Sequence, residues 1–124
     1  MAAAIDLADL VRHLDAYGPR ATVITVSAEH APHVGTSLVE VDGDRVLIRV
    51  GPRAAQNLAR QPELCLTWAP PASNDYQLIV DATAVDVRPD GDTLTVAAEP
   101  RAGIRHRVAG APGTGPSCLA LDQR

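Results

Sequence analysis

The stretch 76–88 constrains the fold most, because three apolar residues stand next to one another in a segment typical of a β-strand. Leu78, Ile79 and Val80 point to alternating faces of such a strand, so both faces need cover. The expected helices are too few to cover a whole sheet. We therefore expect a barrel interior on one side of this strand and a second copy of the chain on the other, which predicts a homodimer.

Five further strands are expected, which makes six in total. Residues 21–26 are dense in β-branched side chains, and the Asp-Gly-Asp turn at 42–44 and the Pro-Asp-Gly-Asp turn at 89–92 are strong strand-ending signals. The first strands should pair as antiparallel neighbours. The expected segments are 21–26, 33–41, 45–50, 64–68 and 93–97.

Two helices are expected beside these strands. Residues 5–17 carry apolar side chains at three- and four-residue spacings and are followed by Gly18 and Pro19, which predicts an amphipathic helix that ends there. Residues 52–60 begin with a proline, which suits the first helical position because the N–H that it lacks would be unpaired there. A short helix is therefore expected between the third and fourth strands.

Length and composition limit the rest. The 124 residues fit a single domain, with 1–18 as an N-terminal helix and 101–124 as an irregular tail in which 117–121 form either a last short strand or a docked end. With 46% apolar and 21% charged residues, the chain is sufficient for one core. A formal net charge of −4 and three aromatic rings argue against a nucleic-acid partner, and the lack of a long apolar run argues against a membrane.

Arg53 is the first candidate binding residue. It falls in the first turn of the expected short helix, where the dipole and free N–H groups disfavour a cation unless an anion is near. A phosphate there would accept backbone N–H groups and a guanidinium contact. The alternative is a solvated arginine on an ordinary helix. Asn57, one turn further on, either faces the same ligand or is simply exposed.

Other reactive side chains give weaker signals. His30 and His33 are three residues apart, but Pro32 lies between them and no third ligand stands close, so no metal site is predicted. Cys65 and Cys118 have no metal-ligand spacing, and no leader segment precedes them, so a reducing, cytoplasmic setting is expected. No motif for a nucleophile with its base is present.

The order of these segments, from the Pro32–His33 strand entry through Arg53 and Asn57 to Pro62, resembles the FMN-binding split-barrel superfamily of pyridoxamine 5′-phosphate oxidase and its flavin- or deazaflavin-dependent relatives. The resemblance covers about residues 21–87. It implies a six-stranded antiparallel split β-barrel, a homodimer and an FMN site at the dimer interface. The activity that it implies is oxidoreduction of an unidentified small molecule, in which the cofactor performs the hydride transfer.

The resemblance also implies positions for the cofactor. Arg53 falls where the family places a phosphate-binding arginine, whereas Ala54 and Gly35 fall where relatives carry two further cations. A deazaflavin or haem remains an alternative to FMN, and a non-catalytic dimeric barrel with a degraded flavin site remains an alternative function. The residues implied to contact the cofactor are Thr36, Ser37, Val50, Gly51, Arg53 and Asn57, with Trp68 packing at the interface.

Overall fold

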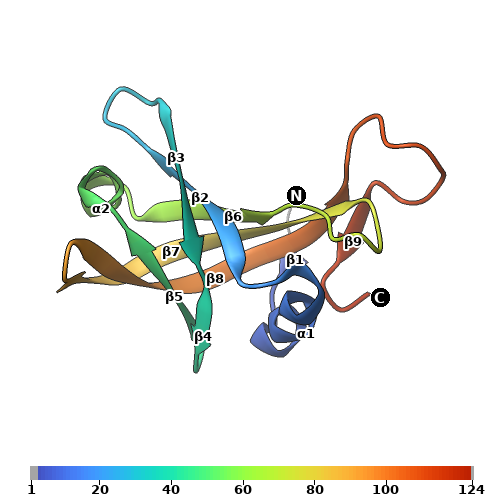
Figure 1. Cartoon of the computed structure of the whole chain (residues 1–124), viewed down its shortest axis with the longest axis horizontal. Coiled ribbons are helices and arrows are strands. Elements are labelled where there is room, and N and C mark those ends of the chain that lie inside the picture. Colours follow the sequence, from blue (N-terminus) through green and yellow to red (C-terminus); the bar gives the residue numbers. More distant parts are fainter. Residues whose placement is uncertain (1–2, 124) are drawn as a thin grey trace.

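The structure is a computed structural model that describes residues 3–123. Within that range, nine antiparallel strands form one sheet in the order β3-β2-β6-β7-β8-β5-β4, and β1 and β9 both pair with β8 (Figure 1). The mainly antiparallel split-barrel fold expected from the sequence is confirmed, with nine strands among the described residues where six were expected. The elements are β1 Ala3–Ala4, α1 Leu7–Tyr17, β2 Arg20–Val26, β3 Pro32–Leu38, β4 Glu40–Asp42, β5 Arg45–Val50, α2 Pro52–Arg60, β6 Glu63–Trp68, β7 Tyr76–Asp90, β8 Thr93–Arg107 and β9 Cys118–Ala120.

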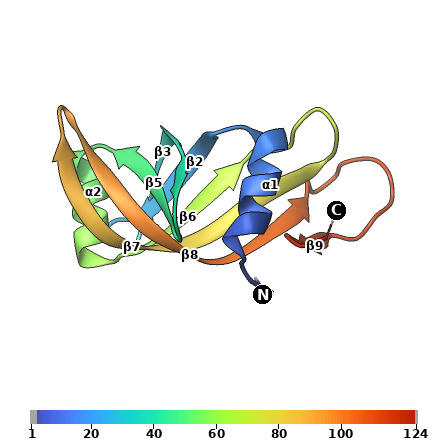
Figure 2. The same ribbon diagram turned by 90° about the horizontal axis from the view of Figure 1, so that it is seen from below.

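The two helices lie at opposite ends of the sheet (Figures 1 and 2). Asp6 caps α1, since its carboxylate accepts a 2.9 Å hydrogen bond from the Ala8 N–H, and the helix ends at Gly18 with a φ of 80°. Helix α2 has the bounds expected from its proline start. Both helix predictions are confirmed, with α1 starting two residues later than expected because Asp6 is the cap.

The expected strand 33–41 is interrupted in the structure. Val39 leaves the ladder, buries its side chain in the core and donates a 2.7 Å backbone hydrogen bond to the Pro19 carbonyl. As a result β3 pairs only with β2, while β4 pairs with β5 across the 42–44 turn. The expectation that the first three strands are direct neighbours therefore holds for β2 with β3 and for β4 with β5, but it is wrong for β3 and β5, which do not pair.

Strand β8 is much longer than the expected 93–97. It continues to Arg107, so the prediction of an irregular tail from residue 101 is wrong for 101–107. Pro100 is tolerated because it lies opposite Ala82, where the β7 register shifts. Later in β8, Gly103 leaves room for the Leu121 side chain, because a Cβ at this position would lie 2.8 Å from it. Strand β9 then docks the chain end on β8.

Apolar side chains of β7 point to both faces of the sheet, as its sequence predicts, although the outer face also carries Gln77 and Asp81. Leu78 and Val80 are fully buried in the barrel. Ile79 lies on the outer face, in register with Thr67 of β6 and Ile104 of β8, and is only partly covered. The inner face is thus filled by the core, and the outer face leaves apolar surface available for a partner.

Candidate cofactor site

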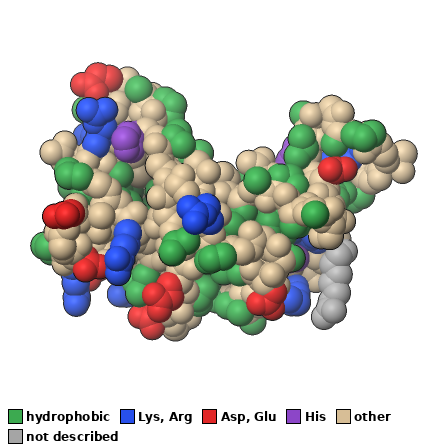
Figure 3. All heavy atoms as spheres, in the orientation of Figure 1, with side chains coloured by type: hydrophobic (Ala, Val, Ile, Leu, Met, Phe, Trp, Pro, Cys, Tyr) green, Lys and Arg blue, Asp and Glu red, His purple; other side chains and the backbone are tan. Residues whose placement is uncertain are grey.

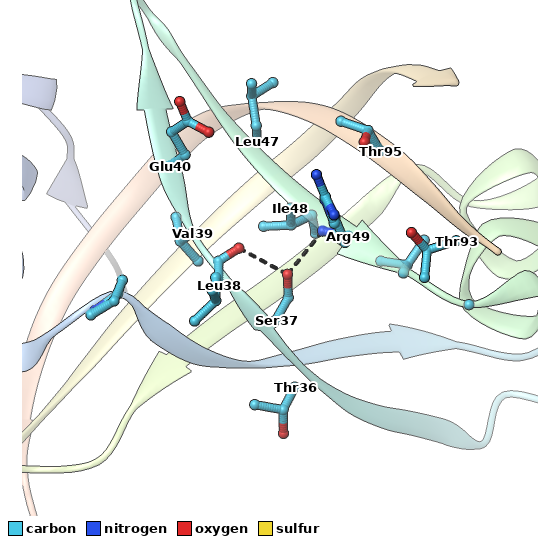
Figure 4. Close-up of a pocket in the computed structure, with 13 residues that line it drawn as sticks. Thr36, Ser37, Leu38, Val39, Glu40, Leu47, Ile48, Arg49, Thr93 and Thr95 are labelled. Atoms are coloured by element: carbon cyan, nitrogen blue, oxygen red, sulfur yellow. Dashed lines mark hydrogen bonds between the residues drawn. The ribbon is translucent and has the colours of Figure 1, made fainter. Parts of the chain in front are cut away.

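A cleft of about 910 Å³ opens where β3 and β5 separate (Figure 4). Four of the residues implied to border a cofactor ring line it together, two on β3 and two at the end of β5. Thr93 and Thr95 of β8 and Glu40 of β4 complete its polar surface. The predicted residues that meet in this cleft are Thr36, Ser37, Val50 and Gly51.

One hydrogen bond closes the barrel beside this cleft. The Arg49 N–H donates to Ser37 Oγ at 2.8 Å, and the Ser37 hydroxyl in turn donates to the Leu38 carbonyl at 2.9 Å (Figure 4). Within residues 3–123, β3 has strand pairing on one side only. Its other edge therefore presents backbone N–H and C=O groups toward β5, where a heteroaromatic ring can exchange hydrogen bonds with them.

The first turn of α2 begins directly beyond the cleft. Gly51 is its N-cap and offers no side-chain cap, and the first helical hydrogen bond runs from the Ala55 N–H to the Gly51 carbonyl at 3.1 Å. The N–H groups of Arg53 and Ala54 are thus left without helical acceptors. Arg53 is exposed and forms no ion pair with the described part of the chain. This end of the site fits a dianion.

Asn57 and Trp68 are both buried. Asn57 is 4% exposed, and its side-chain amide donates a 3.0 Å hydrogen bond to the Thr25 hydroxyl, which joins α2 to β2. Trp68 is 1% exposed and lines none of the clefts described here. Its indole N–H lacks a hydrogen-bond partner among the described residues. Trp68 therefore offers no free surface to a ligand, whereas the small exposed part of Asn57 lines a hollow between the β2–β3 turn and α2.

Two residues of the site region were not expected there from the sequence: Arg49 was not a candidate, and His33 was considered only as a metal ligand. Arg49 lines the cleft from β5, and its guanidinium pairs with Asp90 at 3.1 Å. His33 lines the next hollow along β3. Both are strand residues with no local motif, and they join the site only because the barrel brings β3 and β5 together.

The remaining titratable groups lie outside the cleft. Burial is the main cause that lowers the pKa of His13, whose Nε2 lies 2.6 Å from the Leu121 carbonyl oxygen. Burial, with Asp81 nearby, raises the pKa of the Cys65 thiol to about 11. No group of three His, Cys, Asp or Glu residues that could hold a metal ion occurs within residues 3–123. No helix in the same range is long and apolar enough to cross a membrane.

Solved structures with this architecture are split-barrel proteins. An F420 reductase has a TM-score of 0.64 at 16% identity, with 74% of this chain and 94% of that chain covered. A Clostridium acetobutylicum protein of the pyridoxinephosphate oxidase family has a TM-score of 0.62 at 15% identity, covering 96% and 99%. The haem storage protein of Vibrio cholerae has a TM-score of 0.63 at 14% identity, covering 83% and 97%. The fold is that of the split-barrel proteins related to pyridoxamine 5′-phosphate oxidase.

The sequence itself identifies nearer relatives. An uncharacterized protein of Mycobacterium bovis is 37% identical over 129 residues, which cover 93% of this chain and 90% of the relative. An uncharacterized protein of Mycobacterium tuberculosis matches to the same extent. No family model matches the chain. The chain belongs to the family of these mycobacterial proteins.

Proposed function

We propose that this protein is a homodimeric split barrel that binds FMN, or a deazaflavin in its place, and acts as an oxidoreductase on a small molecule. One observation carries the proposal: the cleft between β3 and β5 leads directly to the uncapped first turn of α2, where Arg53 is free of ion pairs with described residues. A flat ring beside strand edges and a phosphate at a helix start match that arrangement.

The ring end of the proposed site is built from backbone and small side chains. Thr36 and Ser37 of β3 line the cleft together with Val50 and Gly51 at the end of β5, and none of them introduces a charge into it. The bound flavin would supply the hydride-transfer chemistry. The protein would orient the ring and shield it from water, which requires no general acid or base from the chain.

The phosphate end has fewer cations than the family pattern implies. Gly35 stands in open space, since a Cβ there would meet nothing within 4 Å. Ala54 is 6% exposed and belongs to the core. A charge-assisted hydrogen bond contributes roughly 1.5–3 kcal/mol, so each missing contact lowers affinity by about ten- to a hundredfold. We therefore expect FMN to bind more weakly here than in a site with all three charges.

Exposed apolar residues on the outer face of the sheet support the proposed homodimer. Val34 and Leu38 of β3 are 60% and 61% exposed. Val34 lies opposite Ile24 of β2, which in turn lies opposite Cys65 of β6, so the three side chains form a row across the sheet. Figure 3 shows the molecule hollowed between the lobe that carries the β2–β3 turn and the lobe formed by the segment after β8. An apolar sheet face of this kind is typical of a protein interface.

Fluorescence titration with FMN tests the proposal. The protein should quench flavin fluorescence, and Arg53→Ala should weaken binding by roughly ten- to a hundredfold. Arg45→Ala, at the exposed start of β5 and outside the cleft, is the matched control and should bind as the parent does. Protein that changes the fluorescence of neither FMN nor a deazaflavin at any concentration would rule the proposal out.

The second candidate is a non-catalytic dimeric binding protein that has lost its flavin site. Gly35 and Ala54 favour it, because each stands where a cation is expected and neither has a charged side chain. In that case Arg53→Ala changes no measured property of the protein, and the protein is purified without flavin. The same titration therefore separates the two functions.

A further inference from the structure

A second hollow of about 500 Å³ lies between the β2–β3 turn and α2. Its walls come from the turn segment, from the start of β3 and from one side of the helix. Arg53 faces this hollow and not the wide cleft. The polar side chains that line it are Ser27, Glu29, His33, Arg53, Gln56, Asn57 and Arg60.

His33 connects this hollow to the cleft. It also lines a narrow pocket of about 70 Å³ together with Gly35, Thr36, Val50 and Gly51, and the last three of these line the cleft as well. The three hollows therefore follow one another along β3. A ligand with a flat ring in the cleft and an anionic end beside α2 would pass directly by the His33 imidazole.

The packing of α2 brings Arg53 and His33 to the same hollow. His33 is in register with Thr25 of β2, and the Thr25 hydroxyl accepts the buried hydrogen bond from Asn57. This bond holds α2 against the end of the hairpin that carries His33. The His33 ring is partly buried and forms no side-chain hydrogen bond with the described residues, so its nitrogens are available to a ligand.

The charges that face this imidazole are mostly positive. Arg53 lies on α2, and Arg60 of the same helix donates to the Val26 carbonyl. Arg49 in the narrow pocket is already paired with Asp90, and the only carboxylate lining the hollow, among the residues described, is that of the exposed Glu29. A dianion placed between Arg53 and His33 would favour the protonated imidazole, because opposite charges in close contact stabilise each other.

We propose that His33 supplies the second phosphate contact of this site and makes FMN binding pH-dependent, tightening it as the pH falls. The inference rests on the proposed function. His33 and Gly35 are two residues apart on one strand and so share a face. His33 thus lies on the same face of β3 as Gly35, the position at which relatives are expected to carry a permanently charged side chain. A charge that appears only on protonation replaces one that is always present.

FMN titrations at about pH 6.5 and about pH 8 test this, since histidine charge changes across that range. The parent should bind more tightly at the lower pH, and His33→Asn should bind roughly ten- to a hundredfold more weakly there and lose the dependence. His30→Asn is the matched control, because His30 lies outside the hollow and has a φ of 64°, a conformation that asparagine tolerates. Riboflavin, which lacks the phosphate, should not distinguish the variants.

The outcomes separate the two proposals. If the parent binds FMN and His33→Asn binds it equally well at both pH values, the role of His33 is overturned and the flavin site stands. If the parent binds neither FMN nor a deazaflavin, the proposed function is overturned. The role of His33 as a phosphate contact is then tested by titrating inorganic phosphate and following the imidazole signals by NMR. A shift that is absent in His33→Asn supports this role, and unchanged signals in the parent overturn it.

Discussion

The Arg49 N–H donates a 2.8 Å hydrogen bond to Ser37 Oγ, and this bond joins two strands that do not pair with each other. It marks the point at which β3 and β5 begin to separate into the cleft. Because the acceptor is a side chain, the backbone edge of β3 beyond it stays free. The same contact therefore closes the barrel on one side and leaves the candidate site open on the other.

Ser37→Ala should lower the free energy of unfolding by about 1 kcal/mol, the typical net value of one hydrogen bond. Ser37 is 7% exposed, so the freed Arg49 N–H is poorly reached by water. Urea denaturation measures the change. Ser73→Ala, in the exposed loop before β7, is the control and should leave the midpoint unchanged. Equal midpoints for both variants would mean that the bond contributes nothing to closure.

Thr25→Val should destabilise the protein by about 1–3 kcal/mol, because it leaves the buried Asn57 amide without its acceptor. The two side chains have nearly the same shape, so little packing is lost. Thr22→Val changes the same strand on its half-buried face and should alter stability far less. A thermal or urea transition that moves equally in both variants would contradict the anchoring role given to this bond.

The stability of the fold should decrease as the pH falls below about 6.5. Burial is the main cause that lowers the pKa of His13 in the folded state, and Arg105 and Arg12 lower it further. The unfolded chain therefore binds more protons than the folded chain between the two pKa values, and acid favours unfolding. Urea midpoints at about pH 7.5 and about pH 5.5 measure the decrease.

His13→Gln isolates this contribution, because glutamine keeps an N–H donor for the Leu121 carbonyl but does not titrate. Its unfolding free energy should fall less than that of the parent over the same pH interval. His106→Gln, whose ring lies partly buried on β8, is the control and should keep the pH dependence of the parent. A slope that stays the same in His13→Gln would contradict the assignment.

The two cysteines should differ strongly in reactivity. Burial raises the pKa of the Cys65 thiol to about 11, so almost none of it is thiolate at neutral pH, whereas Cys118 is exposed. Iodoacetamide labelling followed by mass spectrometry should show Cys118 modified first and Cys65 only on unfolding. Equal labelling rates in the native protein would show that the β6 thiol is accessible.

The elements that the sequence predicts most accurately are those whose ends are marked by glycine or proline. Strand β5 lies between the Gly43 turn and Gly51, and α2 lies between Pro52 and Pro62, so each boundary is marked by a residue with its own backbone preference. The split of one expected strand into β3 and β4 has no such mark. It depends on the contact of Val39 with Pro19, which only the closed barrel creates.

The extent of β8 could not be predicted for the same reason. Pro100 and Gly103 both argue against a strand when the sequence is examined alone. The register shifts in β7 accommodate the proline, and the docked Leu121 side chain occupies the space beside the glycine. Tertiary packing thus converts two strand-breaking residues into parts of the longest hairpin.

The candidate site is predictable only in part. Arg53 stands at a helix start that proline and glycine define, so its position could be predicted from residue types. Arg49 and His33 carry no such signal. They lie on β5 and β3, two strands that do not pair with each other, and they line one pocket only because the barrel closes. Their identification requires the barrel.

Native mass spectrometry of the protein purified from its own cells tests the central claim most directly, because it reports subunit number and bound ligand together. The account predicts two chains carrying the mass of two flavin or deazaflavin nucleotides, and a loss of that ligand mass in Arg53→Ala. A single chain, or two chains with no flavin mass or with haem in its place, would contradict it.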